Sequence, residues 1–110
     1  MKQSANIISD KHQKMGLSMS KRLLWTKAAW SDYQYWCNHH EETHHRINKL
    51  VKDILKVSVD GLGQPEKLIG SLNGLWTRKI DVSNRLIYAV SKDCLTIISC
   101  RHYLKPRIAL

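Results

Sequence analysis

The hydrophobic and polar positions of this 110-residue chain follow two different periods. Between residues 27 and 56 the apolar residues recur every three or four positions, which is the period of an amphipathic helix. From residue 75 onward they alternate in steps of two, which is typical of strands with one buried face. The stretch "VDGLGQPEKL", residues 59–68, separates the two patterns, and its glycines and proline predict a loop.

Two helices are expected after one short strand. The apolar run "RLLW", residues 22–25, predicts the strand, and Thr26 after it has the side chain of a helix N-cap. The first helix is expected over residues 27–38, with an aromatic-rich face directed into the core: Ala29, Trp30, Tyr33 and either Trp36 or Cys37. The second is expected over residues 41–56, where the apolar face consists of Ile47, Leu50, Val51, Ile54 and Leu55.

Three further strands are predicted by the runs "LWTRKI", "RLIYAV" and "CLTIISCR". The short joins "DVSN" and "SKD" favour an antiparallel meander. The order β-α-α-β-β-β describes an α+β domain with two helices on one face of a small antiparallel twisted sheet. We therefore divide the chain into a polar N-terminal extension (1–20), one domain (21–104) and a C-terminal tail (105–110).

The charge of the chain points to a polyanionic partner. Eighteen Lys and Arg against nine Asp and Glu give a formal net charge of +9. RNA, DNA, an acidic membrane and an acidic protein all fit this charge. No apolar run is long enough to span a bilayer, so no membrane insertion is expected. Three cysteines without paired spacing predict a reducing cytoplasm rather than a disulfide framework, with Cys94 and Cys100 acting as small hydrophobic residues.

Cationic residues on two neighbouring strands are the main candidates for function. Alternation places Arg78 on one face of its strand and Lys79 on the other. Periodicity does not decide which face is open, so either residue could join Arg85 as a phosphate-binding pair. Glu66 at the exit of the loop and His102 on the last strand would add the base and acid of a metal-free ribonuclease.

The string "HHEETHH" contains His40 and His44, four residues apart and therefore on one helix face, as ligands of a transition metal are. No cysteine or carboxylate completes an evident tetrahedral set. We interpret the string as a solvated polar face and predict neither a metal nor another cofactor.

Four stretches together resemble the Txe/YoeB family of bacterial toxins, within the RelE-like ribosome-dependent mRNA endonucleases. They are "KRLLWTKAAWSDYQYW", "GLGQPEKL", "LNGLWTRKIDVSNRLIYAV" and "SCRHY", and they span about three quarters of the chain. The resemblance implies a microbial RNase fold and metal-free cleavage of mRNA in the ribosomal A site. It also implies a cognate antitoxin (YefM/Phd-like) that represses the shared operon together with the toxin, and a possible homodimer.

The resemblance assigns roles residue by residue. Glu66 in "QPEKL" matches the family's general base, and Arg85 in "NRLIY" matches the arginine that stabilises the transition state. Arg78 and Lys79 stand where the family has two arginines, and with Arg101 they are the expected contacts to RNA phosphates. A lysine at the second position lacks the bidentate fork of an arginine.

The C-terminal ending departs from the family. The family closes with Arg-Tyr-His-Tyr, in which the histidine is the general acid and the last tyrosine helps to hold the nucleotide. Here the order is Arg101, His102, Tyr103, Leu104. Without a gap Tyr103 takes the histidine's place, whereas with one residue deleted His102 and Tyr103 restore the pair. We favour the second alignment, in which a bulge or a strand end absorbs the shift.

The altered ending leaves an alternative function open. In that alternative the chain is a catalytically weakened toxin homologue, acting either as an antitoxin-binding co-repressor or as a ribosome binder that does not cleave.

Overall fold

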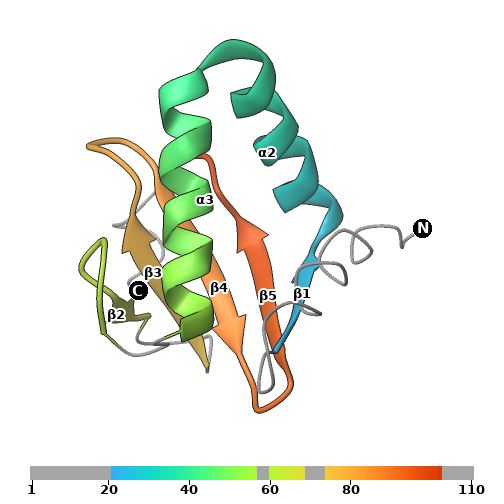
Figure 1. Ribbon diagram of the computed structural model, residues 1–110, viewed down its shortest axis with the longest axis vertical. Helices are drawn as coiled ribbons and strands as arrows, with labels where there is room; N and C mark the ends of the chain where they lie inside the picture. The colour runs from blue at the N-terminus through green and yellow to red at the C-terminus, as the bar shows by residue number, and fades with distance from the viewer. Residues whose placement is uncertain (1–20, 57–59, 69–73, 103–110) are drawn as a thin grey trace.

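The computed structural model describes residues 21–56, 60–68 and 74–102. The predicted extension 1–20, the tail 105–110 and Tyr103 lie outside these ranges. The elements are β1 (Arg22–Trp25), α2 (Lys27–His39), α3 (Glu41–Lys56), β2 (Glu66–Lys67), β3 (Leu75–Lys79), β4 (Arg85–Val90) and β5 (Cys94–Ser99) (Figure 1). The α+β class is confirmed, and both helices and the four predicted strands lie within two residues of their expected bounds.

The five strands form one sheet in the order β1-β5-β4-β3-β2. β3, β4 and β5 make the predicted antiparallel meander. β1, however, pairs in parallel with β5, so the sheet is mixed and the prediction of a wholly antiparallel sheet was wrong at this edge. This pairing joins strands from opposite ends of the described chain, and no turn between them in the sequence indicates it. The two-residue strand β2 was also not predicted, since it lies at the end of the loop.

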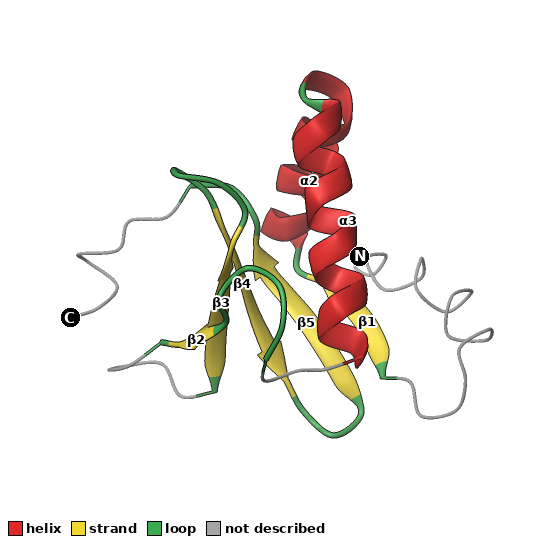
Figure 2. Cartoon of the chain, turned by 60° about the vertical axis from the view of Figure 1, so that its left-hand side comes forward, coloured by secondary structure: helices red, strands yellow, loops and turns green. Residues whose placement is uncertain are grey.

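Both helices lie on one face of the sheet (Figure 2). α2 begins after Thr26, whose hydroxyl oxygen accepts a hydrogen bond from the Ala29 backbone N–H at 3.0 Å. The same hydroxyl donates to the Ile98 carbonyl at 2.8 Å. The predicted N-cap is therefore confirmed, and it also attaches the start of the helix to β5.

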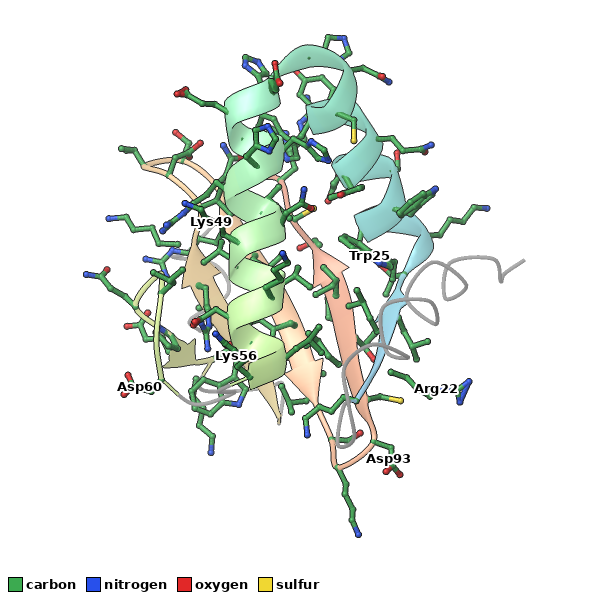
Figure 3. All side chains as sticks on the ribbon, in the orientation of Figure 1. Arg22, Trp25, Lys49, Lys56, Asp60 and Asp93 are labelled. Atoms are coloured by element: carbon green, nitrogen blue, oxygen red, sulfur yellow. The ribbon has the colours of Figure 1, made fainter. Side chains whose placement is uncertain are left out.

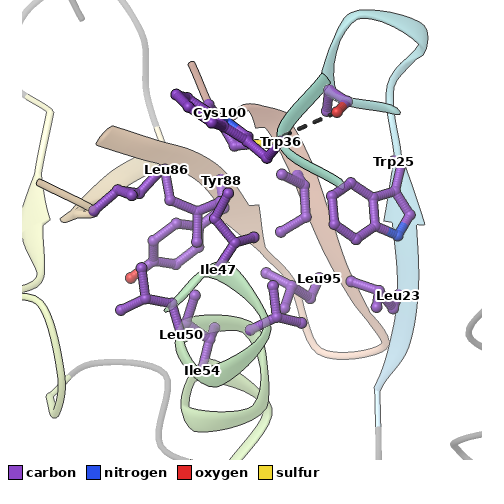
Figure 4. Close-up of a cluster of buried hydrophobic side chains, with 14 residues drawn as sticks. Leu23, Trp25, Trp36, Ile47, Leu50, Ile54, Leu86, Tyr88, Leu95 and Cys100 are labelled. Atoms are coloured by element: carbon purple, nitrogen blue, oxygen red, sulfur yellow. Dashed lines mark hydrogen bonds between the residues drawn. The ribbon is translucent and has the colours of Figure 1, made fainter. Parts of the chain in front are cut away.

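The core fills the space between the helices and the sheet (Figure 4). Its residues are Leu23, Trp25, Ala29, Trp36, Ile47, Leu50, Val51, Ile54, Ile80, Leu86, Tyr88, Leu95, Ile97 and Cys100. Trp36, and not the exposed Cys37, belongs to the buried face of α2. Burial raises the pKa of the Cys100 thiol, so this cysteine is held in its neutral form.

β5 contains a bulge close to its end. Ile87 of β4 is opposite Ser99, whereas the next residue, Tyr88, is opposite Ile97, so Ile98 is an extra residue. The bulge changes the phase of the strand, because Ile97 before it and Cys100 after it are both buried. β5 ends at Ser99, and His102 therefore lies beyond the strand on which it was expected. Among the residues described, no helix is long and apolar enough to cross a membrane.

Candidate active site

The helices decide which face of the meander is open. Arg78 is fully buried and pairs with the buried Leu86, on the face that also carries Tyr88 and is covered by the helices. Lys79 therefore points to the opposite face, where its partner directly across the sheet is Arg85. Of the two cations between which alternation could not choose, Lys79 is the one that lies beside Arg85.

Glu66 joins the same open face from β2. It is paired with Thr77, which has the same orientation on β3 as Lys79. The Nη1 atom of Arg85 lies 3.4 Å from Oε1 of Glu66, and the two side chains are 18% and 67% exposed. An ion pair of this exposure contributes about 0–1 kcal/mol, so it can exchange its partner for another anion. Strands β2, β3 and β4 thus each supply one charged residue to one surface.

Arg78 has a structural position, which corrects the predicted contact to RNA phosphate. Its Nε donates to the Tyr88 hydroxyl at 3.0 Å, and its Nη1 donates to Asp53 Oδ2 at 2.7 Å and to the Leu62 carbonyl at 3.0 Å. Its Nη2 donates to the Asp60 carbonyl at 2.8 Å. A buried guanidinium engaged on all sides cannot reach a phosphate, and its bonds instead join α3, β4 and the loop before β2.

That loop determines where Glu66 lies. Besides the bonds from Arg78, the Gly63 carbonyl accepts from the Lys79 N–H at 2.7 Å, which places the loop against β3. Gly63 has φ 83°, and a Cβ there would lie 2.9 Å from a Leu50 methyl group and 3.2 Å from the Lys79 nitrogen. A glycine is needed for both reasons. Asp60, labelled in Figure 3, is at the start of this loop.

The electrostatics of the buried arginine follow from its contacts. The hydrogen bond from Arg78, with a second from the Leu62 backbone N–H, holds the pKa of the Asp53 carboxyl below its usual range. Burial raises the pKa of the Tyr88 hydroxyl, and the bond from Arg78 opposes that rise. Asp53 is therefore ionised and Tyr88 neutral at pH 7, and in these states each accepts its hydrogen bond from Arg78.

The chain beyond β5 is held by α2. The Cys100 N–H donates to Asp32 Oδ2 at 2.9 Å, and Trp36 Nε1 donates to the Cys100 carbonyl at 2.8 Å, so that Trp36 and Cys100 lie side by side in Figure 4. Arg101 stacks its guanidinium on Tyr35, with Cζ 3.5 Å from the ring centroid. Its predicted contact to a phosphate stays a prediction.

His102 adopts a left-handed backbone conformation, with φ 69°. Its N–H donates to the side-chain oxygen of Asn84 at 2.6 Å. Because Asn84 directly precedes Arg85, the fold brings the His102 backbone to the start of β4, next to the cationic face. The bulge at Ile98 and the early end of β5 are features of the kind that the favoured alignment needs. The role of His102 as general acid stays a prediction, and that of Tyr103 falls outside the described residues.

The histidine-rich junction has local contacts that the sequence did not predict. His44 Nε2 lies 2.9 Å from the Tyr33 hydroxyl, which donates in turn to Asn48 Oδ1 at 2.7 Å, so His44 takes part in joining α2 to α3. His39 stacks on Tyr35, with 4.4 Å between ring centroids. Within the described ranges no group of three or more His, Cys, Asp and Glu is arranged to hold a metal ion.

The fold is that of RelE-like toxins, and comparison with known proteins shows the family. The model of the "YoeB-like toxin of bacterial type II toxin-antitoxin system" family matches residues 25–104. Toxin YoeB of Escherichia coli K12 is 39% identical over 82 residues, which are 74% of this chain and 98% of that protein. The chain therefore belongs to the YoeB-like family and is a toxin of a type II toxin–antitoxin system.

Solved structures agree with this family. The YoeB dimer from Staphylococcus aureus superposes with a TM-score of 0.73 at 30% identity, covering 79% of this chain and 100% of that one. A YoeB–YefM complex from the same organism gives a TM-score of 0.71 at 30% identity, covering 76% of this chain and 98% of that one.

Proposed function

We propose that this toxin is an endoribonuclease that cleaves ribosome-bound mRNA in the A site by acid–base transesterification without a metal. Glu66 takes the proton from a 2′-hydroxyl, and the 2′-oxygen attacks phosphorus. Arg85 and Lys79 stabilise the charge that develops on the phosphate oxygens. His102 protonates the departing 5′-oxygen, and Tyr103 holds the nucleotide. The products are a 2′,3′-cyclic phosphate and a free 5′-hydroxyl.

The observation that carries this proposal is the contact between Glu66 and Arg85 on the open face, 3.4 Å apart. Their weak ion pair gives way to a phosphate at little cost, which frees the carboxylate to accept a proton. The Arg85 side chain is mostly buried, so its guanidinium is already directed before substrate arrives. Lys79 lies directly across the sheet and adds a second positive charge.

The proposal includes partners. A YefM/Phd-like antitoxin covers the toxin in the cytoplasm, operator DNA is bound only through that complex, and a homodimer forms in its absence. The formal charge of +9 suits an acidic antitoxin as well as RNA. The two S. aureus relatives, a YoeB dimer and a YoeB–YefM complex, support both assemblies. Arg101 is the third cation proposed to contact RNA phosphate.

The test is cleavage of a defined mRNA on programmed ribosomes by the antitoxin-free protein, with cuts mapped by primer extension. We expect cuts inside the A-site codon and none in free mRNA. Glu66→Gln and Arg85→Ala should lose cleavage but keep sedimenting with ribosomes. Glu42→Gln, which changes an exposed carboxylate on α3, is the matched control and should cleave normally. A folded protein that binds ribosomes or antitoxin but cuts nothing would favour the non-cleaving alternative.

A further inference from the structure

The turn between β3 and β4 contains a buried asparagine, Asn84, whose side chain accepts a hydrogen bond from the His102 backbone. Asn84 is only 9% exposed. Its amide nitrogen donates to both carboxylate oxygens of Asp81, at 3.0 and 3.2 Å. Its backbone N–H also donates to Asp81 Oδ1, at 2.8 Å. The Asp81 carboxylate thus holds both the backbone and the side-chain amide of Asn84 within the turn.

These contacts orient the remaining polar atom of the side chain. With the amide nitrogen committed to the Asp81 carboxylate, Oδ1 of Asn84 is directed to the His102 N–H, 2.6 Å away. The reversed amide would place two donors against one another at His102 and an oxygen against a carboxylate at Asp81. Only one orientation satisfies every group.

His102 needs such an anchor, because its φ of 69° is a conformation that residues other than glycine rarely adopt. Such a conformation persists where the surroundings impose it. Upstream, α2 holds Cys100 through Asp32 and Trp36, so the ending is already fixed up to two residues before His102. The bond from Asn84 acts on the histidine's own backbone.

We propose that Asn84 is the positioning residue for His102: its side-chain oxygen holds the His102 backbone in the left-handed conformation, and this sets where the imidazole stands relative to Arg85. The inference rests on the proposed function, in which His102 donates the proton to the leaving group. Asn84 touches no substrate in this role and acts through His102 alone.

Substitution in the turn tests the anchor. Asn84→Ala removes the acceptor and should slow single-turnover cleavage about 10- to 100-fold, a part of the 10²–10⁴ that a well-placed general acid contributes. Ribosome affinity should be unchanged. The double substitution Asp81→Asn with Asn84→Asp exchanges amide and carboxylate, so the new carboxylate can still accept from His102 and from the new amide. It should restore cleavage to within a few-fold of wild type.

Val82→Ala is the matched control, because Val82 is in the same turn and is 93% exposed. It should cleave as the wild type does. Thermal melting establishes that each variant is folded. Should Asn84→Ala fail to fold, the double substitution decides: wild-type cleavage supports the anchor, and cleavage as slow as in His102→Gln overturns it.

An activated leaving group separates positioning of the acid from other defects. In an mRNA with a 5′-bridging sulfur in the A-site codon, the 2′-oxygen forms its bond to phosphorus while the P–S bond breaks. The electron pair leaves with the thiolate, which needs no proton. His102→Gln and Asn84→Ala should therefore both be slow on the oxygen substrate and both approach the wild-type rate on the sulfur substrate. Glu66→Gln should be slow on both.

The sulfur substrate distinguishes a wrong role for Asn84 from a wrong role for His102. If His102→Gln recovers on sulfur but Asn84→Ala does not, Asn84 does not position the acid, and the proposed function stands. If His102→Gln stays equally slow on both substrates, His102 is not the general acid, and the proposed mechanism fails at that residue together with this inference.

Discussion

Removing the buried Arg78 should destabilise the toxin severely. Arg78→Ala deletes the bonds to the Tyr88 hydroxyl, the Asp53 carboxylate and the Asp60 and Leu62 carbonyls. Removing one member of a buried ion pair costs about 3–5 kcal/mol, because the partner is left without compensation. Each hydrogen bond to a charged group contributes about 1.5–3 kcal/mol, but these values do not add within one network.

We therefore expect a loss of about 3–5 kcal/mol in the free energy of unfolding. The additional lost hydrogen bonds do not raise this value, because the Asp53 side chain is 22% exposed and water can solvate it in the variant. A domain of this size has about 5–15 kcal/mol in total, so the variant should be close to unfolding. The assay is urea denaturation followed by tryptophan fluorescence.

The neighbouring residue supplies the control. Lys79→Ala changes the opposite face of the same strand, where the side chain is partly exposed, and should cost less than about 1 kcal/mol. It should nevertheless slow cleavage, because Lys79 lies across from Arg85. If Arg78→Ala stayed within about 1 kcal/mol of wild type, or if Lys79→Ala were equally destabilising, Arg78 would not be the structural residue that its contacts indicate.

Two further predictions concern the loop before β2 and its acidic partner. Gly63→Ala should cost about 2–4 kcal/mol of stability, because the residue has a positive φ and a Cβ would lie close to a Leu50 methyl group. Gly74→Ala, also at positive φ but with open space around it, should cost about 1 kcal/mol. Equal costs in urea titrations would contradict this account. The folded-state pKa of Asp53 is lowered, so its contribution to stability is present above its unfolded pKa of about 3.9 and is lost as pH falls through the lower folded value. Asp53→Asn should therefore be less stable than wild type at pH 7, with a difference that closes below about pH 4; a difference that persists at pH 2 would show that the ion pair is not its origin.

Local patterns in the sequence predicted most of the secondary structure. α3 has the predicted bounds, and α2 begins after Thr26 as expected, because helix period and capping depend on residues within a few positions of each other. The pairing of β1 with β5 was not predicted, and the favoured alignment required a bulge or a strand end before His102 without placing it at Ile98. Both features depend on which strands, distant in the sequence, become neighbours in the sheet, and the spacing of residues along the chain does not indicate this.

For the site, the candidate charged residues and the resemblance to the toxin family could both be read from the sequence alone. Alternation also showed that Arg78 and Lys79 must point to opposite faces. Which of them faces the core became clear from the folded arrangement, because the helices cover one side of the sheet and a period of two is the same for either side. The folded arrangement also showed that a turn residue, Asn84, meets the His102 backbone, because that contact exists only once β4 and β5 are paired.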